Sequence, residues 1–163
     1  MATLHVACWR EAYTVLVPDD LAKRFEVAAM ILRWQEHLSK PERFIEAAYD
    51  GSQPVAFVNS GRPVEQLFDG MDGHIAALYV AKTHYRKGLG RMLMAHAAAD
   101  WLAQGGHSIS LGVLAENTQA RSFYEAMGGR LVKTGFYEWH GHQLADAIYV
   151  FEDLARLAAR NPV

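Results

Sequence analysis

Leu78-Tyr79-Val80, with Gly88-Leu89-Gly90-Arg91 starting eight residues after Val80, predicts a β-strand that runs into a glycine loop and then a helix. The first backbone N–H groups of a helix lack a partner within it, and the helix dipole favours anions there. Glycines let a phosphate group approach such a backbone closely. The stretch therefore favours a pyrophosphate-binding site, although the same glycines also fit a plain tight turn.

The composition is that of a single globular domain spanning residues 1–163, with 51% hydrophobic and 21% charged residues. The sequence shows neither a membrane-spanning apolar run nor a secretory signal. Cys8 is the only cysteine, so an intrachain disulfide is impossible and a cytoplasmic location is expected. The net charge of −2 argues against a broad basic surface, so no nucleic-acid or membrane partner is expected.

A local basic cluster surrounds the glycine loop despite the slightly acidic balance of the chain. Its members are Lys82, His84, Arg86, Lys87 and Arg91. Charged side chains of this kind can simply be solvated loop residues, or they can receive an anionic cofactor at the start of the helix.

The spacing of apolar residues and turn residues predicts helices and strands that alternate along the chain. The expected helices cover Leu4 to Val17, Leu21 to Leu38 with Asp19 or Asp20 as N-cap, Gly90 to Ala103, Thr118 to Met127 with Asn117 as cap, and one or two turns within Glu152–Arg160. The expected strands are Phe44–Tyr49, Val55–Asn59, His74–Val80, Ile109–Val113, and a hairpin of Arg130–Trp139 with Gln143–Val150. A strand–helix–strand unit implies parallel pairing and a right-handed crossover, and hence an α/β fold around a mixed sheet.

A second motif follows the strand Ile109–Val113. It consists of Asn117, Ala120, Phe123, Tyr124 and Gly128 in the spacing Asn-x-x-Ala-x-x-Phe-Tyr-x-x-x-Gly. With Leu78-Tyr79-Val80 and its glycine loop, this motif resembles the GNAT superfamily of acetyl-CoA-dependent N-acetyltransferases. The resemblance implies a central mixed, twisted sheet flanked by helices, in which a parallel strand pair splays apart with the help of a bulge.

The chain departs from the family pattern in two places. Tyr85 stands where the family has Gln or Arg, and Arg86 takes the next place, which is often Gly. The family normally begins with a β-strand, whereas this chain begins almost at its first helix, so the first family strand is expected to be missing. The strand Phe44–Tyr49 would then have an open edge, and we expect another segment or a second subunit, as in a homodimer, to cover it.

The resemblance implies transfer of an acetyl group from acetyl-CoA to a primary amine of a small molecule, peptide or protein by direct attack. Tyr124 would donate a proton to the leaving thiolate. A backbone N–H near Tyr79 or Val80 would stabilise the oxyanion. The expected cofactor-binding residues are Leu78, Tyr79, Val80, Tyr85, Arg86, Lys87, Gly88, Leu89, Gly90, Arg91, Asn117, Ala120 and Tyr124.

The sequence offers one candidate for the general base that deprotonates the amine. His74 stands where Glu is common in the family, and a histidine can accept a proton near neutral pH. A solvated strand-end histidine and a chain of waters are the alternatives. No metal site is expected, since His140 and His142 offer two ligands in a turn without a third.

Several of these residues also have simpler interpretations. Asn117 can be only a helix cap, and Tyr124 only a core aromatic. Tyr13 and the loop near Pro18 can line the acceptor site, and Glu138 can attract a cationic amine. A non-catalytic module that senses acetyl-CoA is the main functional alternative; a Rossmann-like nucleotide binder is disfavoured because Gly-x-Gly-x-x-Gly is absent.

Overall fold

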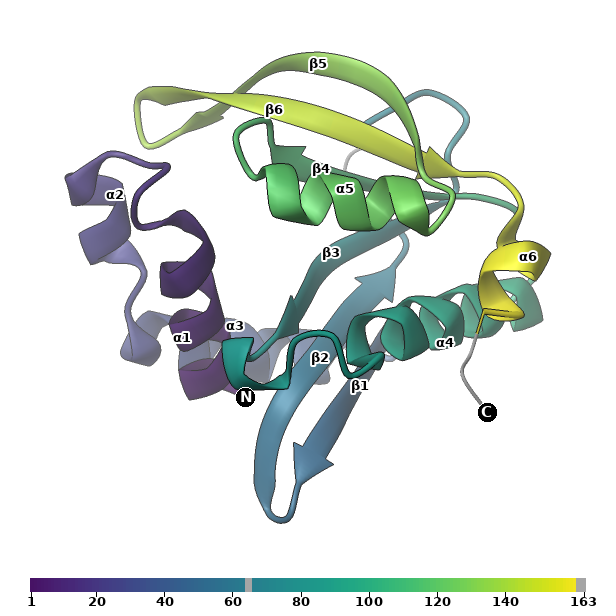
Figure 1. The fold of residues 1–163 in the computed structure, drawn as a ribbon, viewed down its shortest axis with the longest axis horizontal. Helices are drawn as coiled ribbons and strands as arrows, with labels where there is room; N and C mark the ends of the chain where they lie inside the picture. The colour runs from purple at the N-terminus through teal and green to yellow at the C-terminus, as the bar shows by residue number, and fades with distance from the viewer. Residues whose placement is uncertain (64–65, 161–163) are drawn as a thin grey trace.

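The computed structural model of the protein describes residues 1–63 and 66–160 (Figure 1). Its helices are α1 (Ala2–Tyr13), α2 (Asp19–Arg24), α3 (Val27–Leu38), the 3-10 helix η1 (Lys82–His84), α4 (Leu89–Ala103), α5 (Thr118–Ala126) and α6 (Leu154–Ala158). Its strands are β1 (Arg43–Asp50), β2 (Gln53–Gly61), β3 (Gly73–Val80), β4 (Ile109–Leu114), β5 (Arg130–Trp139) and β6 (His142–Phe151). No helix within these ranges has the length and apolar character needed to cross a membrane.

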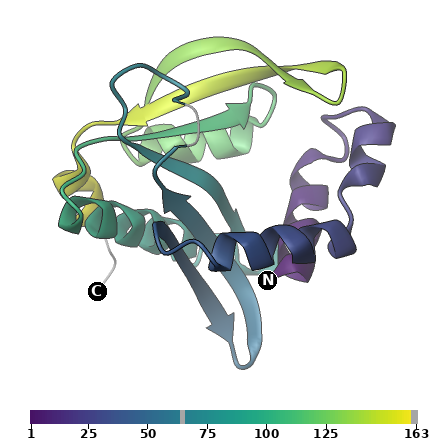
Figure 2. The ribbon, with the colours of Figure 1, turned by 180° about the vertical axis from the view of Figure 1, so that it is seen from behind.

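The strands form one sheet in the order β1-β2-β3-β4-β6-β5. Neighbouring strands are antiparallel except β3 and β4, which run parallel. The predicted mixed sheet and its parallel pair are therefore confirmed. Figure 1 shows α4 and α5 in front of the sheet, and the reverse view in Figure 2 shows α3 on the other side.

Strand β2 has a hydrophobic core on each of its faces, because alternate residues of a strand point in opposite directions. Ala56 and Val58 are fully buried in the core that includes α4, whereas Phe57 is fully buried in the core formed with α1, α2 and α3. The burial of both faces explains why β2 is an almost continuous apolar run rather than an alternating one.

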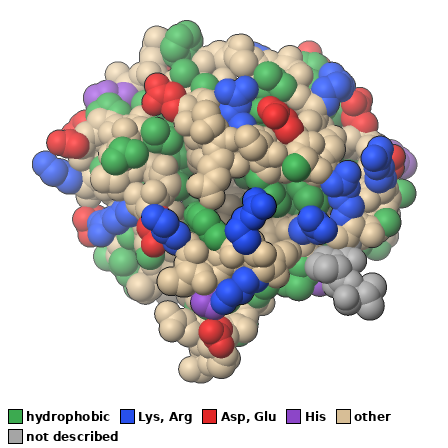
Figure 3. All heavy atoms as spheres, viewed as in Figure 1, with side chains coloured by type: hydrophobic (Ala, Val, Ile, Leu, Met, Phe, Trp, Pro, Cys, Tyr) green, Lys and Arg blue, Asp and Glu red, His purple; other side chains and the backbone are tan. Residues whose placement is uncertain are grey.

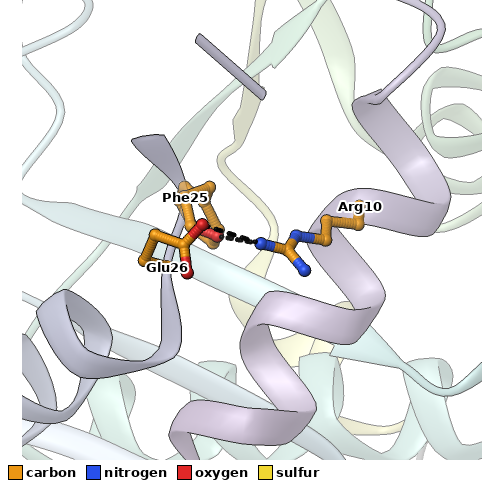
Figure 4. Close-up of polar contacts among 3 residues, drawn as sticks. All are labelled: Arg10, Phe25 and Glu26. Atoms are coloured by element: carbon orange, nitrogen blue, oxygen red, sulfur yellow. Dashed lines mark hydrogen bonds and ion pairs between the residues drawn. The ribbon is translucent and has the colours of Figure 1, made fainter. Parts of the chain in front are cut away.

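The long helix predicted from Leu21 to Leu38 is wrong, because the chain breaks it into α2 and α3 at Phe25 and Glu26. Phe25 leaves the helical region with φ −83° and ψ 79°. The Arg10 guanidinium donates to the Phe25 carbonyl oxygen at 3.2 Å and to Glu26 Oε1 at 3.3 Å (Figure 4). The break turns the Phe25 ring onto Trp9, with ring centroids 4.2 Å apart.

The first helix also ends earlier than predicted, at Tyr13 rather than Val17. The Thr14 hydroxyl donates to the Arg10 carbonyl oxygen at 2.7 Å, and Pro18 disfavours a helical conformation for Val17. Pro18, and not Asp19 or Asp20, occupies the N-cap of α2. The two carboxylates instead lie in the first helical turn, where the helix dipole favours them.

The remaining local predictions are confirmed within a residue or two, apart from a shorter last helix. Asn117 caps α5, and its Oδ1 accepts from Ala120 N at 3.1 Å. Gly51 has φ +59° in the turn between β1 and β2, and Gly141 has φ +81° between β5 and β6. These turns need the left-handed backbone that glycine adopts without strain.

Strand β1 lies at one edge of the sheet. It pairs with β2, and among the described residues no strand pairs with its outer edge. Among the described residues α1 is the first element.

Candidate active site

Strands β3 and β4 diverge after a short stretch of pairing. In the described part of the chain their register contains Gly73 opposite Ile109 and His74 opposite Ser110. Beyond this point β3 continues beside β2, and β4 continues beside β6. The sheet therefore splays open toward Val80 and Leu114, as the family resemblance implied.

A bulge in β3 accounts for the divergence. Asn59 of β2 pairs with Ala77, whereas the next residue, Ser60, pairs with Ile75. Ala76 is thus an extra residue, and a β-bulge bends its strand and increases the local twist. The bend directs the second half of β3 away from β4.

The closed end of the splay is held by Asp72. Its carboxylate accepts hydrogen bonds from Trp101 Nε1 at 3.1 Å, from the His107 and Ser108 backbone N–H groups at 2.9 Å each, and from Ser108 Oγ at 2.9 Å. Burial acts to raise the pKa of Asp72, but the hydrogen bonds outweigh it and hold the pKa at about 2. Asp72 thereby joins the start of β3 to the segment that leads into β4.

The glycine loop lies between β3 and α4. Gly88 is the N-cap of α4, with φ +85°, and no side chain caps this end of the helix. An added Cβ on Gly90 would lie 3.3 Å from Phe123 Cζ of α5. The first turn of α4 therefore presents backbone N–H groups without a competing cap, close to Phe123 of the second motif.

Arg86 has a left-handed backbone, with φ +64°. Glycine takes this conformation freely, whereas an L-residue is strained there by about 1–2 kcal/mol. This explains why the corresponding family position is often Gly. Figure 3 shows Lys and Arg side chains gathered around a hollow on the face that carries α4 and α5.

Tyr124 is buried in α5, with 9% of its surface exposed. Its neighbours include Phe123 and Tyr149, at ring centroid distances of 5.5 and 6.0 Å. Burial raises the pKa of Tyr124, and the proximity of Tyr13 adds to the effect. The hydroxyl is therefore protonated at neutral pH and available as a donor.

Three tyrosines from distant segments converge at this point. Burial raises the pKa of Tyr13 in α1, while hydrogen bonds to Asn117 and Tyr79 act in the opposite direction. Burial raises the pKa of Tyr79 well above its ordinary value, and Tyr13 and Tyr124 both contribute. Tyr13, Tyr79, Tyr124 and the cap residue Asn117 thus form one neutral polar cluster beside the open splay.

His74 lies at the last rung where β3 and β4 still pair. Its Nδ1 lies 3.1 Å from the Ser110 carbonyl oxygen. Since a carbonyl only accepts, Nδ1 carries the proton and Nε2 has a free lone pair in the neutral ring. Burial lowers the pKa of His74 to about 4, although the bond to Ser110 works against the shift. His74 is therefore neutral at pH 7, and it is not the solvated strand-end residue of the simpler alternative.

A cavity of about 460 Å³ opens beside the splay on the side of α1 and α3. Residues from α1, α3, β2, β3, β4 and the β5–β6 hairpin line it, and His74, Tyr13 and Tyr79 are among them. The sequence analysis offered Tyr13 and the loop near Pro18 as a possible lining of the acceptor site. In the structure, Tyr13 and Val17 both line this cavity. At the hairpin tip, His142 Nε2 lies 3.0 Å from Asp20 Oδ2 and so links β6 to α2.

Five polar residues of this cavity were missed by the sequence reasoning. They are His5, Arg33, His37, Asn59 and Asp146. No motif marks them, because they lie in α1, α3, β2 and β6 and only the tertiary fold brings these elements together. In the described residues no group of three His, Cys, Asp or Glu side chains is arranged to hold a metal ion.

A model of the acetyltransferase (GNAT) family matches residues 3–129. The chain therefore belongs to the GNAT acetyltransferase family and is an acyltransferase that uses acetyl-CoA as its cosubstrate. The match includes both motifs, the bulged strand β3 and the glycine loop before α4.

Individual relatives agree with this assignment. The chain is 27% identical over 157 residues to YuaI of Bacillus subtilis (strain 168), described as an uncharacterized N-acetyltransferase, covering 96% of this chain and 88% of the relative. A ribosomal-protein-alanine N-acetyltransferase from Brucella melitensis has a similar structure, with a TM-score of 0.67, 18% identity and coverage of 93% and 92%. A streptothricin acetyltransferase structure from Bacillus anthracis, in complex with acetyl-CoA, has a TM-score of 0.63, 20% identity and coverage of 73% and 67%.

Proposed function

We propose that this protein transfers the acetyl group of acetyl-CoA to the nitrogen of a primary amine by direct attack, in one domain spanning residues 1–163. The observation that carries the proposal is the position of Tyr124 beside the diverging strands β3 and β4. The N-terminus of α4, with its glycine loop, lies on one side of these strands, and the cavity lies on the other. The cofactor would enter from the helix side, and the amine would occupy the cavity.

The pyrophosphate of acetyl-CoA would bind the backbone N–H groups between Tyr85 and Arg91. Lys87 and Arg91 would add positive charge, and the glycines at 88 and 90 allow close approach. Asn117 and Ala120 lie at the start of α5, the helix that follows β4, and would contact the pantetheine arm from the β4 side of the splay.

The pantetheine arm would lie alongside Leu78–Val80 of β3 and pair with its backbone like an added strand. The Ala81 N–H donates to the Val55 oxygen of β2 at 2.8 Å. Because backbone groups alternate in direction along a strand, the N–H groups of Val80 and Leu78 face the opposite, β4 side. Of the two candidate oxyanion donors, Val80 is therefore preferred over Tyr79.

In the reaction, the lone pair of the amine attacks the thioester carbonyl carbon, a C–N bond forms and the C–S bond breaks. The thiolate takes a proton from Tyr124, whose hydroxyl is protonated at neutral pH. Before the attack the substrate ammonium loses one proton through water to the unprotonated Nε2 of His74, which passes it to solvent. The second proton leaves the nitrogen as the amide forms and restores the Tyr124 hydroxyl. The products are the acetamide and free CoA thiol.

The test follows free thiol release from acetyl-CoA for the wild type and Tyr124→Phe across a panel of amines. We expect turnover by the wild type, a kcat lowered about 100-fold in the variant, and acetyl-CoA affinity unchanged by calorimetry. Tyr49→Phe, at an exposed tyrosine in β1, is the control for substitution of a phenol. Acetyl-CoA binding without turnover on any amine would favour the sensing module instead.

We also propose that the protein works in the cytoplasm and forms a homodimer through the outer edge of β1. The buried, unpaired Cys8 fits a reducing compartment. An unpaired strand edge is a template for pairing with a second chain. Sedimentation across a range of protein concentrations tests the dimer, and a monomer at all of them would contradict it.

A further inference from the structure

Large aromatic side chains from four separate parts of the chain line the acceptor cavity. They are Trp9, Tyr13, Phe25, Trp34, Tyr79, Tyr137 and Trp139. The volume of about 460 Å³ lies in the range of small-molecule sites, which is about 300–1,000 Å³. Such walls favour a flat apolar body, since aromatic pairs gain stabilisation beyond the area they bury.

The cavity holds little charge for its size. Among its described lining residues, Asp146 carries the one carboxylate and Arg33 the one guanidinium. Burial lowers the pKa of His5 and of His74 to about 4, and also lowers the pKa of His37, so all three imidazoles are neutral at pH 7. A substrate with several positive charges would find one anionic partner and would be repelled by Arg33.

Asp146 is placed to attract a single ammonium group near the reacting centre. It pairs in register with Leu114, the last residue of β4, and so lies at the open end of the splay. It lines the same cavity as His74, the proposed proton acceptor. The carboxylate therefore provides the one favourable position for the amine that will be acetylated.

Uncharged polar groups also occur among the residues that line the cavity. Polar atoms of four lining residues are buried without a hydrogen-bond partner in the described structure: His5 Nδ1, Trp34 Nε1, His37 Nδ1 and Asn59 Oδ1. Buried polar groups are normally paired, and since these four atoms are closed off from the cavity, a ligand would reach them only after a small shift of the wall. His5 also makes edge contacts with Phe25, Trp34 and Phe57, so the polar atoms lie within the aromatic wall.

We propose, on the basis of the acetyl transfer proposed above, that the acceptor is a small aromatic monoamine. Its ammonium lies toward Asp146, and its ring packs against the aromatic side chains of the cavity wall. Polyamines, aminoglycosides and peptide N-termini are poor acceptors.

The test measures kcat/KM by thiol release for the full chain with tryptamine, tyramine, hexylamine, spermidine, kanamycin and an alanyl peptide. We expect tryptamine or tyramine to exceed each of the other amines at least 10-fold. Trp139→Leu should raise the KM for that aromatic amine about 10-fold with little change for hexylamine. Phe136→Leu is the matched control, because Phe136 lies on the same strand, is 71% exposed and is absent from the cavity wall.

The outcomes separate this inference from the acetyl transfer on which it rests. Faster turnover of hexylamine, spermidine, kanamycin or the peptide would overturn the aromatic monoamine and leave acetyl transfer intact. No thiol release with any amine would overturn both. If Trp139→Leu does not fold, the ranking of the six acceptors with the wild type decides the question by itself.

Discussion

His74 Nδ1 donates to the Ser110 carbonyl oxygen at 3.1 Å, across the last rung that joins β3 to β4 before the two strands separate. The bond fixes the ring at the closed end of the splay and leaves Nε2 unprotonated. One contact thus sets both the position of the imidazole and its tautomer, and it leaves Nε2 as the nitrogen that can accept a proton.

We expect His74→Gln to lower kcat about 100-fold while the affinity for acetyl-CoA stays the same. Glutamine can still donate to Ser110 but has no basic nitrogen. Because the pKa of His74 is about 4, this ring stays unprotonated above about pH 5. Its protonation therefore does not lower the kcat of the wild type in that range. Profiles of kcat against pH for both proteins check this, and an unchanged kcat in the variant would assign His74 a structural role only.

The stability of the fold should decrease between pH 6.5 and pH 4, and His5, like His74, contributes to this loss. The pKa of His5 is lowered to about 4 by burial first, and by His37 and Arg33. In the unfolded chain the ring binds a proton near pH 6.5, so acid favours unfolding across this window, by on the order of 2 kcal/mol at its lower end. Urea unfolding at pH 7 and pH 4.5 measures the loss.

The substitution His5→Phe should reduce this acid-induced loss of stability, since phenylalanine keeps the edge contacts with Phe25 and Trp34 and has no proton to bind. The exposed His107→Phe serves as the control and should leave the pH dependence as it is in the wild type. An identical acid-induced loss in His5→Phe would show that other groups cause it.

Substitution of Gly88 should affect both stability and cofactor binding. The backbone of Gly88 has φ +85°, where an alanine costs about 1–2 kcal/mol. Gly105→Ala is the matched control, because Gly105 has φ +82° and open space around its Cβ position, beyond the C-terminal end of α4. We expect similar losses of stability in the two variants, and weaker acetyl-CoA binding by calorimetry in Gly88→Ala alone.

Loss of the Asp72 carboxylate should open the junction between β3 and β4. The variant Asp72→Ala leaves the Trp101 Nε1, His107 and Ser108 donors without their acceptor, and we expect a loss of about 2–4 kcal/mol. Since the pKa of Asp72 is about 2, its contribution is complete above the unfolded value of 3.8 and is lost as the pH falls toward 2. Asp69→Ala, an exposed neighbour, should cost little, and equal losses in both variants would contradict the assignment.

The sequence came close to the fold where the signal is local. The Asn117 cap and the Gly51 and Gly141 turns agree with the structure. The parallel pair of β3 and β4 is not local, but the strand–helix–strand order predicted it correctly. Its errors lie where distant residues act, as at Phe25, where the helix breaks and Arg10, 15 positions earlier, binds the freed carbonyl.

The sequence alone determined the family motifs and the elements that carry them, because cap geometry, positive φ and apolar periodicity are set by residues a few positions apart. The tertiary structure decided how far β3 and β4 diverge, through the bulge at Ala76, and which side chains meet in the cavity. Tyr13, Tyr79 and Tyr124 belong to three separate elements, so their convergence depends on packing between the sheet and its helices. The neutral state of His74 and the sparse charge of the acceptor cavity follow from that packing, because burial removes the water that would otherwise stabilise charge.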